Sequence, residues 1–313
     1  MKALAEFVMR GRAQALMIAV AGAVIVLFAW VSAAVVALVT LRKGPAEGVW
    51  LLAWALLPAA IIAWRFGDTS AVALLLGTAS LALVLRATVS LSLALLASVA
   101  VGVAAGILML SVGEAYLEQV RIELVEPYVA YLEQYASRNG EMVTLPRPGA
   151  IAIAGMIGTG TSTLSILSLL LARYWQASLY NPGGFGQEFR TLRYPAAVSL
   201  ALLVGVLLIF SQGAEWRTWA MIGVAPLMFA GLGLVHARAR QKAWSGMLLA
   251  LFYIAWFLFG AMQMLVVMLA VVDGWWDFRG RWGSVPGDSL APPKDRRDDT
   301  TDQRSDDNDE RDQ

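Results

Sequence analysis

Six apolar segments of the chain are long enough to cross a bilayer as helices. They comprise residues 48–64, 70–85, 87–112, 149–172, 195–211 and 218–235, and none of them contains an ionisable side chain. The hydrocarbon core of a bilayer is about 30 Å thick, and helices of about 20 apolar residues cross it. Because backbone groups in lipid must be hydrogen-bonded within the segment, these runs predict membrane-spanning α-helices.

Two further apolar stretches, one near each end of this region, have an ambiguous length. Residues 15–41 and 246–272 each comprise 27 residues, which corresponds to about 40 Å of helix at about 1.5 Å per residue. Such a length is long for one crossing and short for two. Each stretch is therefore either a single tilted helix or a hairpin that enters and leaves the membrane on the same side.

The distribution of lysine and arginine favours the hairpins. With single crossings and a cytoplasmic amino terminus, ten basic residues near the membrane fall inside and nine outside. With hairpins the split becomes fourteen inside and five outside, which satisfies the positive-inside rule. The sequence therefore predicts an all-α polytopic membrane helix bundle, with six full spans flanked by two terminal helical hairpins or re-entrant pairs. We expect the bends near Trp30 and Ser32 in the first pair and near Gly260 in the second.

Composition sets the class of protein and its domains. Hydrophobic residues make up 58% of the 313-residue chain and charged residues only 15%, which excludes an ordinary soluble domain. We expect a membrane domain over residues 1–283. Residues 284–313 hold ten acidic and five basic residues with few apolar ones, which predicts a disordered cytoplasmic tail. We expect a multi-pass protein of the bacterial inner membrane, with the lipid bilayer but no nucleic acid as a partner.

The only sizeable polar insert comprises residues 113–148. Its pattern predicts one short helix over 114–126 and a second that starts at Pro127 and ends near Asn139-Gly140. In the second helix an apolar and aromatic stripe is formed by Tyr128, Tyr131, Leu132 and Tyr135. We expect this insert on the periplasmic side, where it either rests on the lipid headgroups or covers an outward-facing cavity as a lid.

Small and hydroxylated residues are concentrated in the fourth predicted span, between Gly155 and Ser165. Their four-residue spacing is typical of close helix packing, and their hydroxyls could also line a polar cavity. Within the same span, Leu170 is expected to face lipid. The candidates for lining a ligand cavity are Thr159, Thr161, Ser162, Thr163, Ser165 and the intramembrane Gln263.

Two polar motifs at the predicted cytoplasmic face are candidate docking sites for a protein partner or for anionic lipid. Residues 173–193 interleave aromatic side chains and arginines around an Asn-Pro-Gly-Gly turn, and residues 273–279 place two carboxylates four apart beside an arginine. A membrane-resting loop and local ion pairing are the alternatives. The candidates are Trp175, Tyr180, Asn181, Phe185, Arg190, His236, Asp273, Asp277 and Arg279.

Three of these motifs, taken in order, resemble a known family. They are Leu41-Arg42-Lys43-Gly44, the Gly-Leu-x-Leu-x-His pattern that ends at His236, and Asp273-x-Trp-Trp-Asp277-Phe278-Arg279. Over residues 10–282 the chain resembles the YybS-like family of uncharacterised bacterial inner-membrane proteins. That family has no established activity and is similar in fold to the substrate-binding membrane subunits of energy-coupling-factor transporters. The resemblance therefore implies a binding or transport role and supplies no catalytic residue.

The absence of certain side chains from the spans excludes several classes of mechanism. No span contains a carboxylate, a lysine or a histidine of the kind that marks proton relays and ion-coupled transport. The chain has no cysteine and one histidine, so we expect no enzyme activity, no metal site and no cofactor. Two hypotheses remain. The protein is a small-molecule-binding transport subunit that needs a separate energising partner, or it is a structural or assembly protein without a small-molecule ligand.

Overall fold

The computed structural model describes residues 2–139 and 144–282, and all regular elements in these ranges are helices. The predicted tail, residues 284–313, lies outside the described residues. The helices are, in chain order, α1 (Lys2–Arg10), α2 (Arg12–Val24), η1 (Val26–Phe28), α3 (Ala29–Lys43), α4 (Pro45–Phe66), α5 (Ser70–Thr88), α6 (Leu91–Val112), α7 (Glu114–Val120), η2 (Arg121–Val125), α8 (Glu126–Arg138), α9 (Ala150–Tyr180), α10 (Gly184–Arg190), α11 (Ala196–Phe210), η3 (Ala214–Trp216), α12 (Arg217–Gln241), α13 (Gly246–Leu258), α14 (Gly260–Trp276) and α15 (Phe278–Arg281).

The long helices confirm a polytopic all-α architecture. Five helical segments of the described chain are long and apolar enough to cross a membrane: α4, α5, α6, α9 and the continuous segment of η3 and α12. The bent pair of α13 and α14 raises this number to six if the pair forms one span. The six predicted spans coincide with α4, α5, α6, α9, α11 and α12. The 15 residues of α11 make it shorter than a typical spanning helix.

Both terminal stretches are broken helices. The first break comprises Ile25, which is extended, and the short η1 helix. It ends at Phe28, just before Trp30, so the break lies close to the expected position, on the amino-terminal side of Trp30 and Ser32. Ser32 is fully buried inside α3, where its hydroxyl donates to the carbonyl oxygen of Ala19 at 2.6 Å. This side chain holds α3 against α2 and does not cause the bend.

The second break lies where it was expected. Helix α13 ends at Leu258 and α14 begins at Gly260, and the axis turns by 108° between them. Gln263 in the first turn of α14 donates from Nε2 to the carbonyl oxygen of Trp256 at 3.2 Å. This bond satisfies one of the carbonyl groups that a broken helix leaves without a partner.

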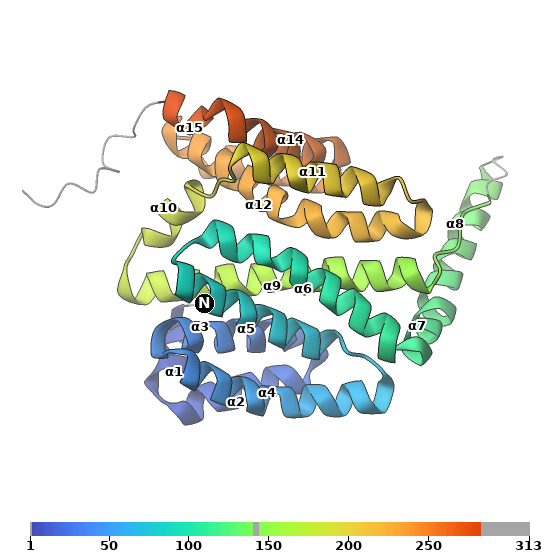
Figure 1. The fold of residues 1–313 in the computed structure, drawn as a ribbon, viewed down its shortest axis with the longest axis horizontal. Coiled ribbons are helices and arrows are strands. Elements are labelled where there is room, and N and C mark those ends of the chain that lie inside the picture. Colours follow the sequence, from blue (N-terminus) through green and yellow to red (C-terminus); the bar gives the residue numbers. More distant parts are fainter. Residues whose placement is uncertain (1, 140–143, 283–313) are drawn as a thin grey trace, which may run out of the picture.

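The two ends of the bundle carry different elements. Figure 1 shows α1, α10 and α15 at one end, and α7 and α8 at the opposite end. Helix α9 runs between these ends and packs against α3, α5, α6 and α12. Leu170 is buried in this core at 8% exposure, so the expectation that it faces lipid was wrong.

Close contact between α6 and α9 depends on two glycines. A Cβ atom built on Gly158 would lie 2.5 Å from the carbonyl oxygen of Gly102, and one built on Gly102 would lie 2.9 Å from the carbonyl oxygen of Gly158. Real side chains do not approach a backbone oxygen this closely. The small-residue spacing in α9 therefore serves the close backbone approach that is typical of membrane helices.

The polar insert forms one continuous helical segment that contains a π-helical turn, and not the two separate helices that were predicted. Helix α7 continues into the π-helical turn η2, and α8 follows directly with Pro127 in its first turn. Because proline has no N–H and its ring clashes with the carbonyl group four residues earlier, the preceding turn widens instead of ending the helix. The tyrosine stripe of α8 (Tyr128, Tyr131 and Tyr135) is exposed, and α8 extends away from α7 along the end of the bundle (Figure 1).

Candidate functional site

A tight turn between α4 and α5 places one carboxylate in a buried position. Helix α4 ends at Phe66, and the next residue, Gly67, has a left-handed conformation (φ of 74°) and donates its N–H to the carbonyl oxygen of Ala63 at 2.8 Å. Asp68 follows and accepts a 2.9 Å hydrogen bond from the backbone N–H of Ser70, where α5 begins. The amino end of a helix favours such a negative charge. Asp68 is only 9% exposed.

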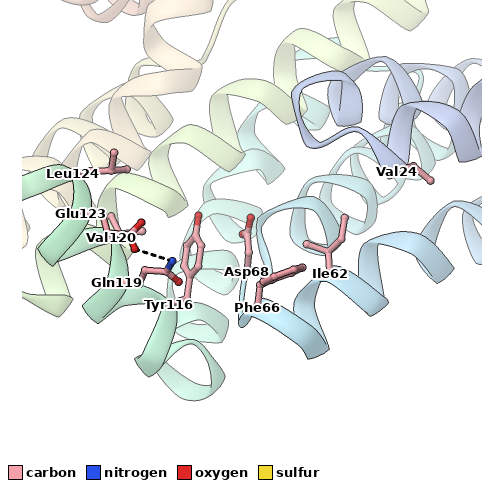
Figure 2. Close-up of a pocket in the computed structure, with 9 residues that line it drawn as sticks. All are labelled: Val24, Ile62, Phe66, Asp68, Tyr116, Gln119, Val120, Glu123 and Leu124. Carbon is pink, nitrogen blue, oxygen red and sulfur yellow. Dashed lines mark hydrogen bonds between the residues drawn. The ribbon is translucent and has the colours of Figure 1, made fainter.

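Tyr116 of α7 lies against this turn. A Cβ atom on Gly67 would lie 3.2 Å from the Cβ atom of Tyr116, so the aromatic side chain begins directly beside the turn. The polar ends of Tyr116 and Asp68 point in the same direction (Figure 2). Burial, followed by the charge of Asp68 and a hydrogen bond to it, raises the pKa of Tyr116. The phenol therefore stays protonated at neutral pH and can donate to the carboxylate.

These two side chains line a pocket with a volume of about 550 Å³. Its polar lining is formed by Asp68, Tyr116, Gln119 and Glu123, and its apolar lining by Val24, Ile62, Phe66, Val120 and Leu124. The residues come from the end of α2, the end of α4, the turn after it, α7 and η2. The first helix break therefore contributes Val24 to the same site as the polar insert.

The acidic groups of the pocket have no basic partner. In the ranges 2–139 and 144–282, neither Asp68 nor Glu123 forms an ion pair, and Glu123 accepts a 3.2 Å hydrogen bond from Gln119 (Figure 2). The nearby Arg121 is engaged by two other carboxylates, Glu118 and Glu126. The pocket thus combines aromatic and apolar walls with negative charge that the described protein does not neutralise.

This site is not among those predicted from the sequence. Asp68-Thr69-Ser70 precedes an apolar run, where such residues ordinarily mark the start of a helix, and Asp68 was not among the candidate site residues. Tyr116 and Glu123 were placed in the polar insert without a partner. The signal that could have identified the site is the acidic residue between two spans on the same predicted side as the insert. Its proximity to α7 depends on tertiary packing.

The predicted ligand-cavity residues lie elsewhere. Thr159 donates from its hydroxyl to the carbonyl oxygen of Thr218 in the α9–α12 contact, at 2.7 Å. Thr161, Ser162 and Ser165 are buried in α9, and Thr163 is half-buried. Gln263 lies in α14 with its bond to Trp256. The pocket at Asp68 is lined by none of these six residues.

The two predicted docking motifs contact each other. Asp273, which is 1% exposed, forms an ion pair with Arg279 and accepts a 3.0 Å hydrogen bond from the N–H of Phe278. Arg279 also donates to the carbonyl oxygens of Arg190 at 2.7 Å and Leu192 at 2.9 Å. These bonds tie the end of α14 to the segment that follows α10.

The remaining docking candidates differ in exposure. Tyr180 and Asn181 are exposed at the end of α9, and the guanidinium of Arg42 lies 3.9 Å from the centre of the Tyr180 ring. Trp175 is fully buried and offers no surface to a partner. Phe185 stacks on Phe189, whose ring contacts that of His236, and the His236 Nε2 atom lies 2.7 Å from the hydroxyl oxygen of Tyr253.

Comparison of the chain with protein-family models, curated proteins and solved structures yields no match. The resemblance to the YybS-like family therefore stays a prediction.

Proposed function

We propose that this multi-pass membrane protein is a transport subunit that binds a small molecule at the pocket around Asp68 and Tyr116 and depends on a separate partner for energy. One observation carries the proposal: a carboxylate that is nine-tenths buried and has no ion pair in the described chain lines a pocket of about 550 Å³. Pockets of this size hold small molecules. A buried charge without a counter-charge destabilises a protein, so its presence favours a binding role.

The position of the pocket fits capture from outside the cell membrane. The pocket lies at the end of the bundle that carries α7, and the exposed residues Tyr180 and Asn181 lie at the end of α9 near α10, on the opposite side (Figure 1). The charge distribution of the sequence supports a periplasmic α7 and a cytoplasmic α10 in a bacterial inner membrane. An energising partner would then bind from the cytoplasm, as the YybS-like resemblance also implies.

The alternative function, a structural or assembly protein, is favoured by a separate observation. The hydroxyl-bearing residues of α9 are packed into contacts with neighbouring helices, as shown by the Thr159 bond to Thr218 and the contact of Gly158 with Gly102. This arrangement needs no ligand. The pocket at Asp68 is therefore the place where the two functions can be separated by experiment.

Narrowing the pocket should abolish ligand binding without unfolding the protein. Gln119 lines the pocket, whereas Gln134 is an exposed residue of α8 outside it. We expect at least one compound from a panel of small cationic, neutral and anionic amphipathic molecules to raise the melting temperature of the wild type and of Gln134→Trp in nanodiscs, but not that of Gln119→Trp. A ligand at about 100 times its Kd stabilises by about 2.7 kcal/mol, which such a measurement detects. If no compound separates the two variants, the proposal is wrong.

Labelling of single cysteines tests the topology. The chain has no native cysteine, so Ser137→Cys in the insert and Ser284→Cys after the last described helix can each be made in the natural sequence. With two terminal hairpins, a membrane-impermeant thiol reagent added to intact cells lacking an outer membrane barrier should label Cys at 137 and not at 284. Labelling of both positions, or of neither, would contradict a hairpin at one end of the chain.

A further inference from the structure

The charge of the Asp68 pocket points to a class of ligand, an inference that rests on the proposed function. Two carboxylates, Asp68 and Glu123, line the pocket, and no arginine or lysine does. Arg121, the basic residue nearest in sequence to Glu123, is occupied by Glu118 and Glu126. The hydrogen bond from the Ser70 N–H stabilises the Asp68 carboxylate but does not cancel its charge. A cationic ligand would supply the missing counter-charge.

The walls of the pocket favour an organic cation over a metal ion. Calcium takes six to eight oxygen ligands, and magnesium requires a near-octahedral shell of oxygens. This pocket offers two carboxylates, one of which is held by Gln119, and most of its lining is apolar or aromatic. An aromatic face such as that of Tyr116 attracts ammonium groups, whereas the Phe66 ring already has the Arg65 guanidinium 5.6 Å from its centre. The polar part of the site therefore fits an ammonium group better than a bare metal ion.

Exposed apolar residues at the edge of the pocket form an apolar rim, which indicates the chemistry of the part of the ligand beyond its ammonium group. Val24, Phe66 and Leu124 line the pocket and are exposed at 56%, 61% and 66%. They come from three elements: the end of α2, the end of α4 and η2. Figure 2 shows Val24 and Leu124 on opposite sides of the Asp68 and Tyr116 pair. An alkyl chain attached to the ammonium group could lie along this rim and remove it from water.

We propose that the pocket binds an amphipathic organic ammonium ion, with the ammonium group at Asp68 and the alkyl part along Val24, Phe66 and Leu124. A free alkyl amine and a lipid with a primary ammonium headgroup share this chemistry. Asp68 is the main recognition residue because it is buried and lies between Tyr116 and Phe66 in Figure 2, whereas Glu123 is exposed and contributes to the charge of the entrance.

Three compounds of similar shape test the ligand class: hexylammonium, 1-hexanol and hexanoate. Binding to the full-length protein in phosphatidylcholine nanodiscs is measured by calorimetry. We expect hexylammonium to bind the wild type, and hexanol and hexanoate to bind at least about tenfold more weakly. Asp68→Asn should weaken hexylammonium binding by about ten- to a hundredfold, because a hydrogen bond to a charged group is lost while the cap to Ser70 is kept.

Matched variants separate this inference from the proposed function. Glu114→Gln removes an exposed carboxylate of α7 that does not line the pocket, and it should leave hexylammonium binding unchanged. If Asp68→Asn fails to fold, Glu123→Gln serves instead, with an expected weakening of a few-fold.

If hexanol or hexanoate binds as well as hexylammonium and Gln119→Trp blocks that binding, the ligand class is wrong and the binding function stands. If hexylammonium binding is insensitive to both Asp68→Asn and Gln119→Trp, the ligand class is wrong, and the binding function is wrong as well if no other compound of the panel separates Gln119→Trp from Gln134→Trp.

The source of the ammonium group is decided by a change of lipid. Adding phosphatidylethanolamine to the nanodiscs should weaken apparent hexylammonium binding to the wild type if the lipid headgroup occupies the same site. Unchanged binding identifies a free amine as the ligand. Each result agrees with an ammonium site and assigns it to one of the two sources.

Discussion

Replacing Asp273 by asparagine is expected to destabilise the protein by about 3 to 5 kcal/mol, because it leaves the partly buried guanidinium of Arg279 without its counter-charge. The Asp273 side chain is 2% exposed and that of Arg279 is 16% exposed. Asn can still accept the hydrogen bond from the N–H of Phe278, so the variant removes the charge and keeps the shape. The free energy of unfolding in mixed detergent micelles measures the effect.

Asp277→Asn is the matched control. The Asp277 side chain is 52% exposed, and its ion pair with Arg193 at 2.8 Å is screened by solvent, so its loss should cost about 1 kcal/mol or less. Asparagine also tolerates the left-handed conformation of this residue, whose φ is 45°. Equal effects of the two substitutions would show that the Asp273 pair contributes no more than a surface ion pair. The double variant Asp273→Asn/Arg279→Gln should lose less free energy of unfolding than the sum of the losses in the two single variants.

The spans were predictable because their signal is local. A run of apolar residues without charge has one stable form in lipid, a helix that satisfies its own backbone. Helices α4, α5, α6, α9, α11 and α12 accordingly begin and end within a few residues of the predicted segments, apart from the extensions of α9 to Tyr180 and α12 to Gln241. Those extensions lie in polar sequence, where hydropathy no longer marks the end of the helix.

The pocket was not predictable because its residues are brought together by packing. Val24, Phe66 and the α7–η2 residues Tyr116 and Glu123 belong to three segments that are far apart in the chain, and each is ordinary for its own segment. Only the contact of α7 with the turn at Gly67 turns Asp68 from a helix-starting residue into the carboxylate of a pocket. The first helix break illustrates the same limit, since Ser32 fits a bend by composition but is used to join α3 to α2.

The docking candidates were chosen by residue type. The structure shows that residue type alone does not determine whether a side chain is exposed or already has a partner within the protein. For Asp273 and Arg279 the sequence left partner docking and local ion pairing open, and in the structure the two side chains pair with each other and hold the segment around Arg190 in place. Trp175 was chosen as an interfacial aromatic residue and is fully buried. Tyr180 and Asn181, from the same stretch of sequence, are exposed. A partner surface at this end of the bundle should therefore be sought around the end of α9.

Replacing Gly158 by alanine is expected to destabilise the protein by about 1 to 3 kcal/mol, as overpacking of a close contact typically does. The new Cβ atom would lie 2.5 Å from the carbonyl oxygen of Gly102, which belongs to the backbone of α6 and cannot rotate away. The two helices must separate, and the contacts around them are lost. Gly158→Leu should have a larger effect in the same direction.

Gly160 provides a control on the same helix, two residues away, because a Cβ atom there would have no other atom within 4 Å. Alanine is a better helix former than glycine, so Gly160→Ala should leave the free energy of unfolding unchanged or raise it slightly. A general effect of replacing glycine in α9 would change the free energy of unfolding of both variants, whereas loss of a packing contact would lower it for Gly158→Ala alone. If the two variants are equally stable, α6 and α9 are not held together by this glycine contact, and the packed arrangement that favours a purely structural role loses its main support.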